Sequence, residues 1–156
     1  MIKRALKPSA ARVLVIGFGN PGRRDDGLGP AAAERLRSRR LRGVSTDADY
    51  QLNIEDALAV SRHDVVVFVD AARNLRKPYA FTPVRAAAAL PPMSHTLGPE
   101  AVLAVAAELY GRTPEAWLLA IRGHRWTLGE GLSDKAEKNL ALALGFLGTF
   151  LKEVRP

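Results

Sequence analysis

The sequence predicts an α/β protein: one three-layer α/β/α sandwich in which helices flank a mostly parallel sheet of about five strands. Short apolar runs typical of buried strands alternate with stretches that repeat apolar residues at helical spacing. No internal repeat, low-complexity segment or linker divides the 156 residues, a length that ordinarily forms one domain. We therefore predict a basic N-terminal extension over residues 1–11 and a single α/β domain over residues 12–156.

Five segments are predicted to be strands. Residues 13–18 and 65–70 are continuous apolar runs, a pattern typical of strands that are buried on both faces. The other candidates are residues 44–52, 81–86 and 115–121. The run at 65–70 is rich in β-branched residues and ends on a carboxylate, so it is the strongest strand signal in the chain.

Four segments are predicted to be helices. The first begins at residue 28 and ends in the arginine cluster before Gly43, and the others cover residues 54–60, 99–109 and 134–151. Pro99 suits the first turn of the third helix, and Gly111 suits its end. Ser133 is placed to cap the last helix. The proline-containing stretch 90–99 is expected to be a loop before the third helix.

Composition limits the classes of function. The net charge is +7, and the densest cationic cluster is Arg35, Arg37, Arg39, Arg40 and Arg42. This cluster ends a predicted helix, where cations complement the helix dipole, and no aromatic residues interleave with it. We therefore favour a solvated basic face and predict no nucleic-acid partner, although an acidic partner or nucleic acid remains the alternative for this cluster.

Location is predicted from what the chain lacks. No apolar run approaches the length that spans a bilayer, and residues 1–10 show no secretory signal. Cysteine is absent, which excludes disulfides, thiolate metal sites and a cysteine nucleophile. We expect a cytoplasmic protein, with no membrane partner.

Two carboxylates are predicted to meet at one edge of the sheet. Asp26 follows the first strand and Asp70 ends the strand at 65–70, and ligands of such sheets bind beyond the carboxyl ends of the strands. His95 lies in a loop that the topology permits at the same edge. Carboxylates and an imidazole suit zinc, nickel, manganese or iron, so these three residues form a candidate divalent-metal site.

Each of these three residues also has a purely structural interpretation. Asp26 could cap a helix, Asp70 could begin a turn, and His95 could be an ordinary loop histidine. In the metal interpretation, the neighbouring Asp25 is left as the helix cap.

The glycine loop before the first helix permits a second interpretation. Gly17-Phe18-Gly19-Asn20-Pro21-Gly22 matches the dinucleotide pattern G-x-G-x-x-G, and Asp47 and Asp49 lie near the position of a ribose-binding acid. Against a dinucleotide stand Pro21, which removes a backbone donor, and the carboxylates of Asp25 and Asp26. No Gly-Lys-Ser/Thr follows the loop and no G-x-S-x-G exists, which excludes a P-loop and leaves a serine hydrolase without its nucleophile motif.

Trp126 has two possible roles. It lies near Arg122, His124 and Arg125, where it could meet a partner, although core packing is the commoner role of a tryptophan.

The motifs at these positions resemble those of one known family. Gly17-Phe18-Gly19-Asn20 and then Asp25-Asp26-Gly27-Leu28-Gly29 resemble the opening G-x-G-N and D-(D/E)-G-x-G motifs of the nickel–iron hydrogenase maturation proteases, peptidase family M52. Val69-Asp70-Ala71 and Ser94-His95-Thr96-Leu97 continue the resemblance, which extends from about residue 13 to the last helix. Together and in this order, these motifs are fairly specific.

The resemblance implies a function, a fold and a set of site residues. The family consists of endopeptidases that remove the C-terminal extension of the hydrogenase large-subunit precursor after nickel insertion, and its fold is phosphorylase/hydrolase-like. Its metal-contacting residues match Asp26, Asp70 and His95, which are therefore both the expected catalytic residues and the expected metal ligands. The metal is nickel supplied by the substrate, which the enzyme senses, and other divalent metals are expected to occupy the site in vitro.

Two departures from the family pattern accompany the resemblance. Residues 49–55 replace a glycine-rich segment found in many members, which leaves the choice of hydrogenase open, and Pro30 stands where an aliphatic residue is common. We expect a monomer whose partner is the large-subunit precursor. The alternative function is a non-catalytic metal- or dinucleotide-binding α/β module.

Overall fold

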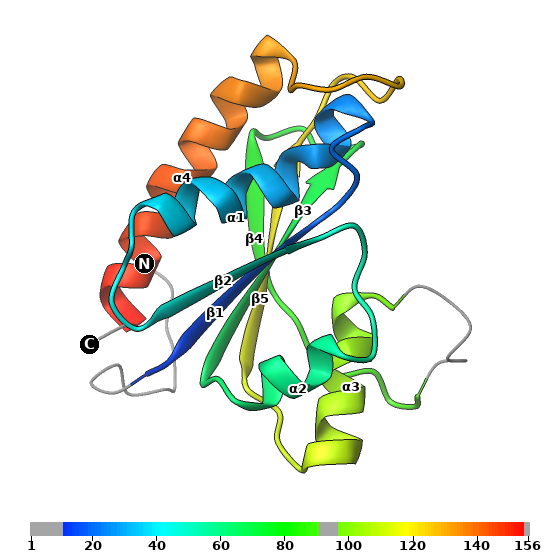
Figure 1. The fold of residues 1–156 in the computed structure, drawn as a ribbon, viewed down its shortest axis with the longest axis vertical. Coiled ribbons are helices and arrows are strands. Elements are labelled where there is room, and N and C mark those ends of the chain that lie inside the picture. The colour runs from blue at the N-terminus through cyan, green and yellow to red at the C-terminus, as the bar shows by residue number, and fades with distance from the viewer. Residues whose placement is uncertain (1–10, 91–96, 155–156) are drawn as a thin grey trace.

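The computed structural model describes residues 11–90 and 97–154, which form a five-stranded sheet covered by helices on both faces (Figure 1). The strands are β1 (Val13–Phe18), β2 (Val44–Asp49), β3 (Val65–Ala72), β4 (Tyr79–Pro83) and β5 (Glu115–Arg122). The helices are the short 3-10 helix η2 (Arg24–Gly27), α1 (Leu28–Ser38), α2 (Asp56–Ser61), α3 (Pro99–Tyr110) and α4 (Asp134–Val154).

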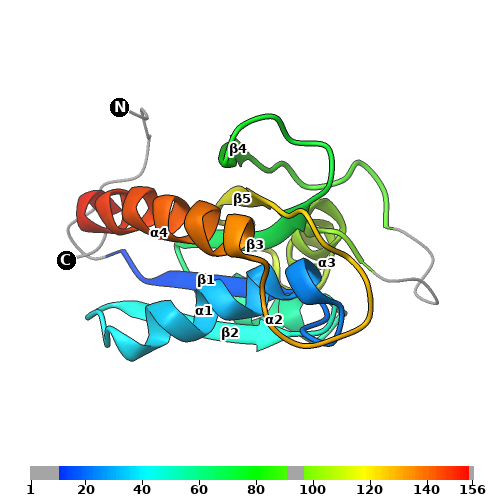
Figure 2. The same cartoon turned by 90° about the horizontal axis from the view of Figure 1, so that it is seen from above.

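The strand order is β2-β1-β3-β5-β4, and every neighbouring pair is parallel except β4 with β5. In Figure 2, β2 and β4 lie at opposite ends of the sheet. The first four strands in this order therefore end at one edge, and β4 begins there. The prediction of a mostly parallel five-stranded α/β sheet is confirmed.

Two hydrophobic clusters make up the core, one on each face of the sheet. The residues of α1 and α4 pack with Val13, Val15 and Val67 on one face, whereas those of α2 and α3 pack with Leu14 and Ile16 on the other. Alternate side chains of β1 therefore enter opposite clusters, which explains why its sequence is apolar throughout. Among the described residues, no helix combines the length and hydropathy needed to cross a membrane.

The fourth strand differs from its predicted position at 81–86. Pairing with β5 begins earlier, because the carbonyl of Pro78 already accepts the Arg122 N–H at 2.9 Å. A proline lacks an N–H but keeps its carbonyl, so Pro78 can start an antiparallel edge strand. The strand ends at Pro83, although Val84 still donates to Ala116 at 2.9 Å.

Glycines let the first turn of α1 lie directly on the ends of β1 and β3. A Cβ on Gly29 would lie 2.5 Å from the Val69 carbonyl oxygen and 2.7 Å from the Phe18 nitrogen. A Cβ on Gly17 would collide with the Gly29 carbonyl oxygen. Only a residue without a side chain permits this approach of helix and strand backbones.

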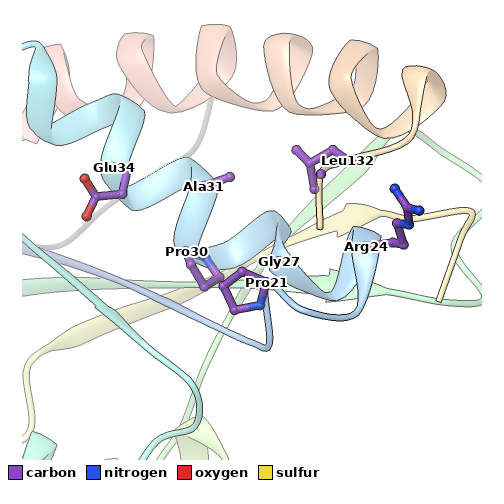
Figure 3. Close-up of a pocket in the computed structure, with 8 residues that line it drawn as sticks. Pro21, Arg24, Gly27, Pro30, Ala31, Glu34 and Leu132 are labelled. Atoms are coloured by element: carbon purple, nitrogen blue, oxygen red, sulfur yellow. The ribbon is translucent and has the colours of Figure 1, made fainter. Parts of the chain in front are cut away.

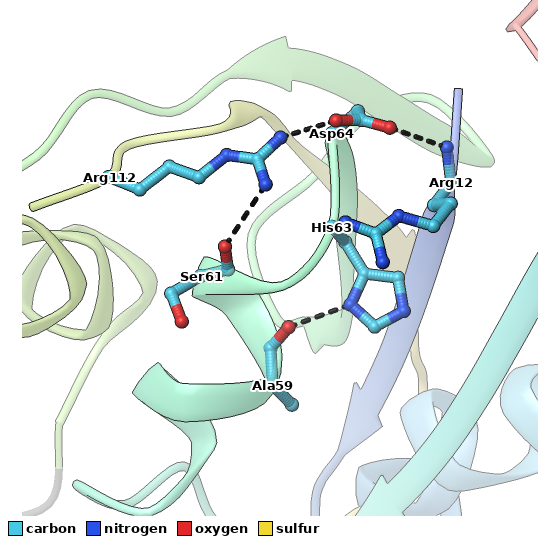
Figure 4. A network of polar contacts seen from close by, with 6 residues as sticks. All are labelled: Arg12, Ala59, Ser61, His63, Asp64 and Arg112. Carbon is cyan, nitrogen blue, oxygen red and sulfur yellow. Dashed lines mark hydrogen bonds and ion pairs between the residues drawn. The ribbon is translucent and has the colours of Figure 1, made fainter. Parts of the chain in front are cut away.

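A polar network joins the start of the strands at the opposite edge of the sheet (Figure 4). Asp64 accepts the backbone N–H of Arg12 at 2.8 Å and pairs with the guanidinium of Arg112, which also donates to the Ser61 carbonyl at 3.3 Å. The Arg12 hydrogen bond contributes most to lowering the pKa of Asp64. His63 Nδ1 lies 2.7 Å from the Ala59 carbonyl oxygen. These contacts fasten the amino ends of β1 and β3.

We predict that Gly29→Ala lowers the free energy of unfolding by about 2 kcal/mol or more, because the new methyl group has to displace backbone atoms. Gly145→Ala is the control, since Gly145 lies in α4 and a Cβ added there would meet no atom within 4 Å. That change should stabilise the protein by about 0.5–1 kcal/mol through helix propensity. Urea unfolding of both variants measures the difference, and equal stabilities would contradict the packing argument.

Candidate functional site

Asp26 and Asp70 lie close together at the carboxyl edge of the sheet. Asp26 belongs to η2, the turn between β1 and α1, and Asp70 lies near the end of β3. The contact between Gly29 and Val69 holds these two segments against each other. Asp26 Oδ2 accepts the Asn20 N–H at 2.9 Å, which orients its carboxylate on the glycine loop.

Burial and the neighbouring carboxylate perturb Asp70. Desolvation raises the pKa of Asp70 to about 6, the charge of Asp26 adds to this rise, and a hydrogen bond from the Ala71 N–H at 2.8 Å opposes it. A carboxyl with a pKa near 6 can both give and take a proton at neutral pH. Two adjoining carboxylates also attract a cation, which would relieve their repulsion.

Asp25 has a different role from the predicted helix cap. The residue before α1 is Gly27, with no side-chain capping bond, and the fully buried Asp25 carboxylate faces the segment between β5 and α4. It accepts the backbone N–H groups of His124, Arg125 and Ser133 at 2.7, 2.8 and 2.8 Å, and the Ser133 hydroxyl at 2.7 Å. The helix-cap prediction is therefore wrong, because backbone donors from a distant segment satisfy this carboxylate.

The hydrogen bonds to Asp25 outweigh the cost of its burial. Burial alone would raise its pKa, but the bonds from Ser133, His124 and Arg125 lower it overall. Ser133 Oγ also accepts the Ala136 N–H at 3.2 Å, so the predicted cap of α4 is confirmed. Asp25 thus joins η2, which carries Asp26, to the start of α4. The sequence pattern did not indicate this link, because the donors to Asp25 lie about 100 residues further along the chain.

His95, the third predicted site residue, lies outside the described residues. The proximity of Asp26 and Asp70 agrees with their predicted meeting at one edge, whereas the three-residue metal site stays a prediction.

A second group of carboxylates lies at the end of β2. Asp47, Asp49 and Asp56 each place an oxygen within 4.8 Å of the others. Burial raises the pKa of both Asp49 and Asp56, and the neighbouring carboxylates add to the rise. Asp56 Oδ2 accepts the Asn53 N–H at 2.8 Å, so this buried side chain already serves the turn before α2.

A mostly apolar cavity of about 270 Å³ lies beside η2 and α1 (Figure 3). Its lining residues are Pro21, Arg24, Gly27, Pro30, Ala31, Glu34, Gly131 and Leu132. Neither Asp26 nor Asp70 lines this cavity, so the cavity is not where the acidic pair would act. The acidic pair lies instead at the edge of the sheet.

The glycines of the loop lie against the protein's own backbone. A Cβ on Gly19 would meet the Asp26 carbonyl oxygen, as one on Gly17 would meet that of Gly29. These glycines therefore allow η2 and the first turn of α1 to lie against the end of β1.

The fold and the acidic pair define an α/β protein with a candidate acid–base or cation site at the carboxyl edge of its sheet. Solved structures of NiFe hydrogenase maturation proteases have this fold. HycI from Thermococcus kodakarensis matches with a TM-score of 0.70 and 22% identity, covering 91% of this chain and 93% of that one. The maturating endopeptidase HybD from E. coli matches with a TM-score of 0.69 and 21% identity, over 91% and 93% of the two chains.

A hydrogenase 2 maturation peptidase from a Thaumarchaeota archaeon gives a TM-score of 0.67 and 22% identity, covering 90% of this chain and 98% of that one. The sequence matches no protein-family model and no curated protein. The predicted fold is therefore confirmed over nearly the whole chain, at an identity that establishes the fold alone.

We predict that Asp70→Asn stabilises the metal-free protein at pH 7.5 by about 1–3 kcal/mol. The raised pKa means that the folded protein binds more protons than the unfolded chain between about pH 4 and 6, so the parent loses stability as the pH rises through that window. The asparagine oxygen can still accept the Ala71 N–H. Urea unfolding at pH 3.5 and 7.5 tests this, and an equal effect at both values would contradict it.

We predict that Asp25→Asn destabilises the protein at pH 7 by about 2–4 kcal/mol, because an amide cannot accept from all the donors around this position. Asp64→Asn is the control, also a carboxylate with a lowered pKa, and should cost about 1 kcal/mol. Because the pKa of Asp25 is lowered, its carboxylate stabilises the folded protein at pH values above the ordinary carboxyl pKa. This stabilisation is lost as the pH falls below that pKa. Equal losses in the two variants at pH 7 would argue against the role of Asp25.

Proposed function

We propose that this protein belongs to the NiFe hydrogenase maturation proteases and is an endopeptidase that removes the C-terminal extension of a large-subunit precursor after nickel insertion. The observation that carries the proposal is the acidic pair Asp26 and Asp70, held at the carboxyl edge of this fold by the glycine motif. Structures named as hydrogenase maturation proteases share the fold over about nine-tenths of the chain, which supports the assignment.

In this proposal nickel enters as part of the substrate, and the enzyme senses it with Asp26, Asp70 and His95. When bound, the ion would polarise the scissile carbonyl or activate a water molecule. Two carboxylates and an imidazole fit a divalent nickel ion as hard and intermediate ligands. Other divalent metals can take its place in vitro.

Asp70 is suited to proton transfer in this reaction. Its pKa of about 6 lies much closer to neutral pH than that of an ordinary carboxyl, so the group can accept and return a proton during the reaction. Asp26 is oriented by the Asn20 N–H and contributes a second negative charge beside it. A cation at the edge of the sheet would draw both carboxylates into their charged form and so couple substrate binding to the chemistry.

The proposal also specifies a partner and a cellular location. The substrate is the large-subunit precursor, and the expected cytoplasmic monomer would meet it there. The segment 49–55 departs from the glycine-rich pattern of many family members and begins at Asp49, whose carbonyl accepts the Gly19 N–H of the glycine loop at 3.0 Å. It is a candidate for selecting the particular hydrogenase.

A non-catalytic metal- or dinucleotide-binding module is the alternative function. Within this alternative, the acidic pair favours metal over dinucleotide, because two carboxylates attract a cation and repel a pyrophosphate. Binding of nickel without cleavage of any precursor would support the metal-binding module. Micromolar binding of NAD(H) would support the dinucleotide-binding one.

We predict that the parent protein shortens a nickel-loaded large-subunit precursor, and that Asp26→Ala, Asp70→Ala and His95→Ala lower the rate at least about 100-fold. Gel mobility and mass spectrometry of the product measure cleavage, and nickel calorimetry measures loss of the ligands. The control is Asp134→Ala, which removes an exposed carboxylate from the first turn of α4.

Absence of cleavage by the parent, or cleavage unaffected by Asp26→Ala, would overturn the protease mechanism. Unchanged nickel binding in all three site variants would show that the predicted ligands are wrong. A precursor without nickel should remain uncut if the enzyme senses the metal in its substrate.

A further inference from the structure

Charge is unevenly distributed along the sheet edge that carries Asp26 and Asp70. Residues 44–61, which include β2 and its following turn, contain Asp47, Asp49, Glu55 and Asp56 but no lysine or arginine. Residues 71–83 and 116–129 contain Arg73, Arg76, Lys77, Arg122 and Arg125 but no aspartate or glutamate. We call these two groups the acidic limb and the cationic limb.

The strand order places the two limbs on opposite sides of the acidic pair. β2 is at one end of the sheet, β1 and β3 are in the middle, and β5 and β4 form the other end. Because β4 runs antiparallel, the residues before it lie at the same edge as the residues after β3 and β5. Along this edge the acidic limb comes first, Asp26 and Asp70 lie in the middle, and the cationic limb comes last.

Hydrogen bonds hold the cationic limb directly beside the acidic pair. The Gly123 N–H donates to the Ala72 carbonyl at 3.0 Å, only two residues beyond Asp70. The Arg125 N–H donates to Asp25, the immediate neighbour of Asp26, at 2.8 Å. Within the limb, the Arg122 guanidinium at the end of β5 donates to the carbonyl of Arg76 before β4 at 3.1 Å. This bond joins the two segments of the cationic limb.

Two cations of this limb, Arg73 and Arg125, are exposed and have no carboxylate partner among the described residues. The guanidinium carbon of Arg73 lies 4.2 Å from the ring centroid of Trp126, a cation–π contact that leaves its charge unneutralised. In the described ranges, neither arginine forms an ion pair, and both side chains are exposed. Asp25 is fully buried and faces N–H donors, and Glu130 lies beyond this segment, where its carbonyl accepts from Arg24 at 2.8 Å.

We propose that the cationic limb binds a carboxylate-bearing segment of the peptide that lies across the site, with Arg73 and Arg125 as its specificity-determining residues. The carboxylates come from acidic side chains or from the free end of the peptide chain. The acidic limb repels the same segment, so the charge distribution fixes the direction in which the peptide lies. This inference rests on the proposed function for its peptide substrate.

Peptide binding without metal or cleavage provides the first test. The probe is a fluorescein-labelled octapeptide of alternating glycine and glutamate, compared with its lysine counterpart by fluorescence anisotropy at low salt. We expect the glutamate peptide to bind the parent, and Arg73→Glu/Arg125→Glu to weaken it roughly tenfold, since two attractions become repulsions. Added salt should weaken binding by the parent as the charges are screened.

The matched control is Arg39→Glu/Arg42→Glu, which makes the same change in net charge after α1, near Gly43 at the opposite edge of the sheet. This control should weaken binding of the glutamate peptide far less than Arg73→Glu/Arg125→Glu does. Arg125→Glu alone keeps the Arg73–Trp126 contact and provides a variant whose folding is least affected. A C-terminally amidated probe separates the two carboxylate sources, since it loses affinity only where the terminal carboxylate contributes.

Equal weakening in the two double variants would overturn the inference, as would tighter binding of the lysine peptide. Preferential binding of a single-stranded oligonucleotide of equal charge, with no binding of the glutamate peptide, would also overturn it. In the precursor assay, Arg73→Glu/Arg125→Glu should raise the KM for the precursor more than Arg39→Glu/Arg42→Glu does. Cleavage with equal KM in both variants would refute only this inference, whereas charge-dependent peptide binding without any cleavage would refute only the protease function.

Discussion

The close contact between the first turn of α1 and the ends of β1 and β3 determines the rest of the structure. Helix and strand backbones ordinarily stay apart because side chains fill the space between them. Glycine at 17 and 29 removes those side chains, and the Gly29 backbone then lies against the carbonyl of Val69. This contact sets the position of η2, and with it the distance between the acidic residues that η2 and β3 carry.

The neighbouring aspartates 25 and 26 show how one short turn serves stability and function at once. The carboxylate of Asp25 is satisfied by donors from the segment before α4, and its pKa is lowered. Asp26 faces the edge of the sheet, where its charge helps to raise the pKa of Asp70. Stabilising interactions are therefore concentrated on one carboxylate, whereas the adjoining pair retains an unfavourable repulsion that a bound cation would relieve.

The order of the strands places acidic and basic residues at opposite ends of this edge of the sheet. The acidic turn after β2 and the cationic loops around β4 and β5 are separated by the two central strands. A peptide crossing the site would meet charges of opposite sign at its two ends. The antiparallel direction of β4 is essential here, because it returns the loop with Arg73, Arg76 and Lys77 to the same edge as Asp70.

The sequence by itself determined the α/β class, the two central strands and the placement of Asp26 and Asp70 at one edge, because apolar periodicity and chain direction are local properties. It also marked the glycine motif whose resemblance to the maturation proteases agrees with the fold of the solved structures. Only the tertiary structure decided what Asp25 binds, since its donors come from about 100 residues further along the chain. The same holds for the start of β4, the raised pKa of Asp70 and the pairing of Arg73 with Trp126, which all depend on contacts between segments distant in sequence.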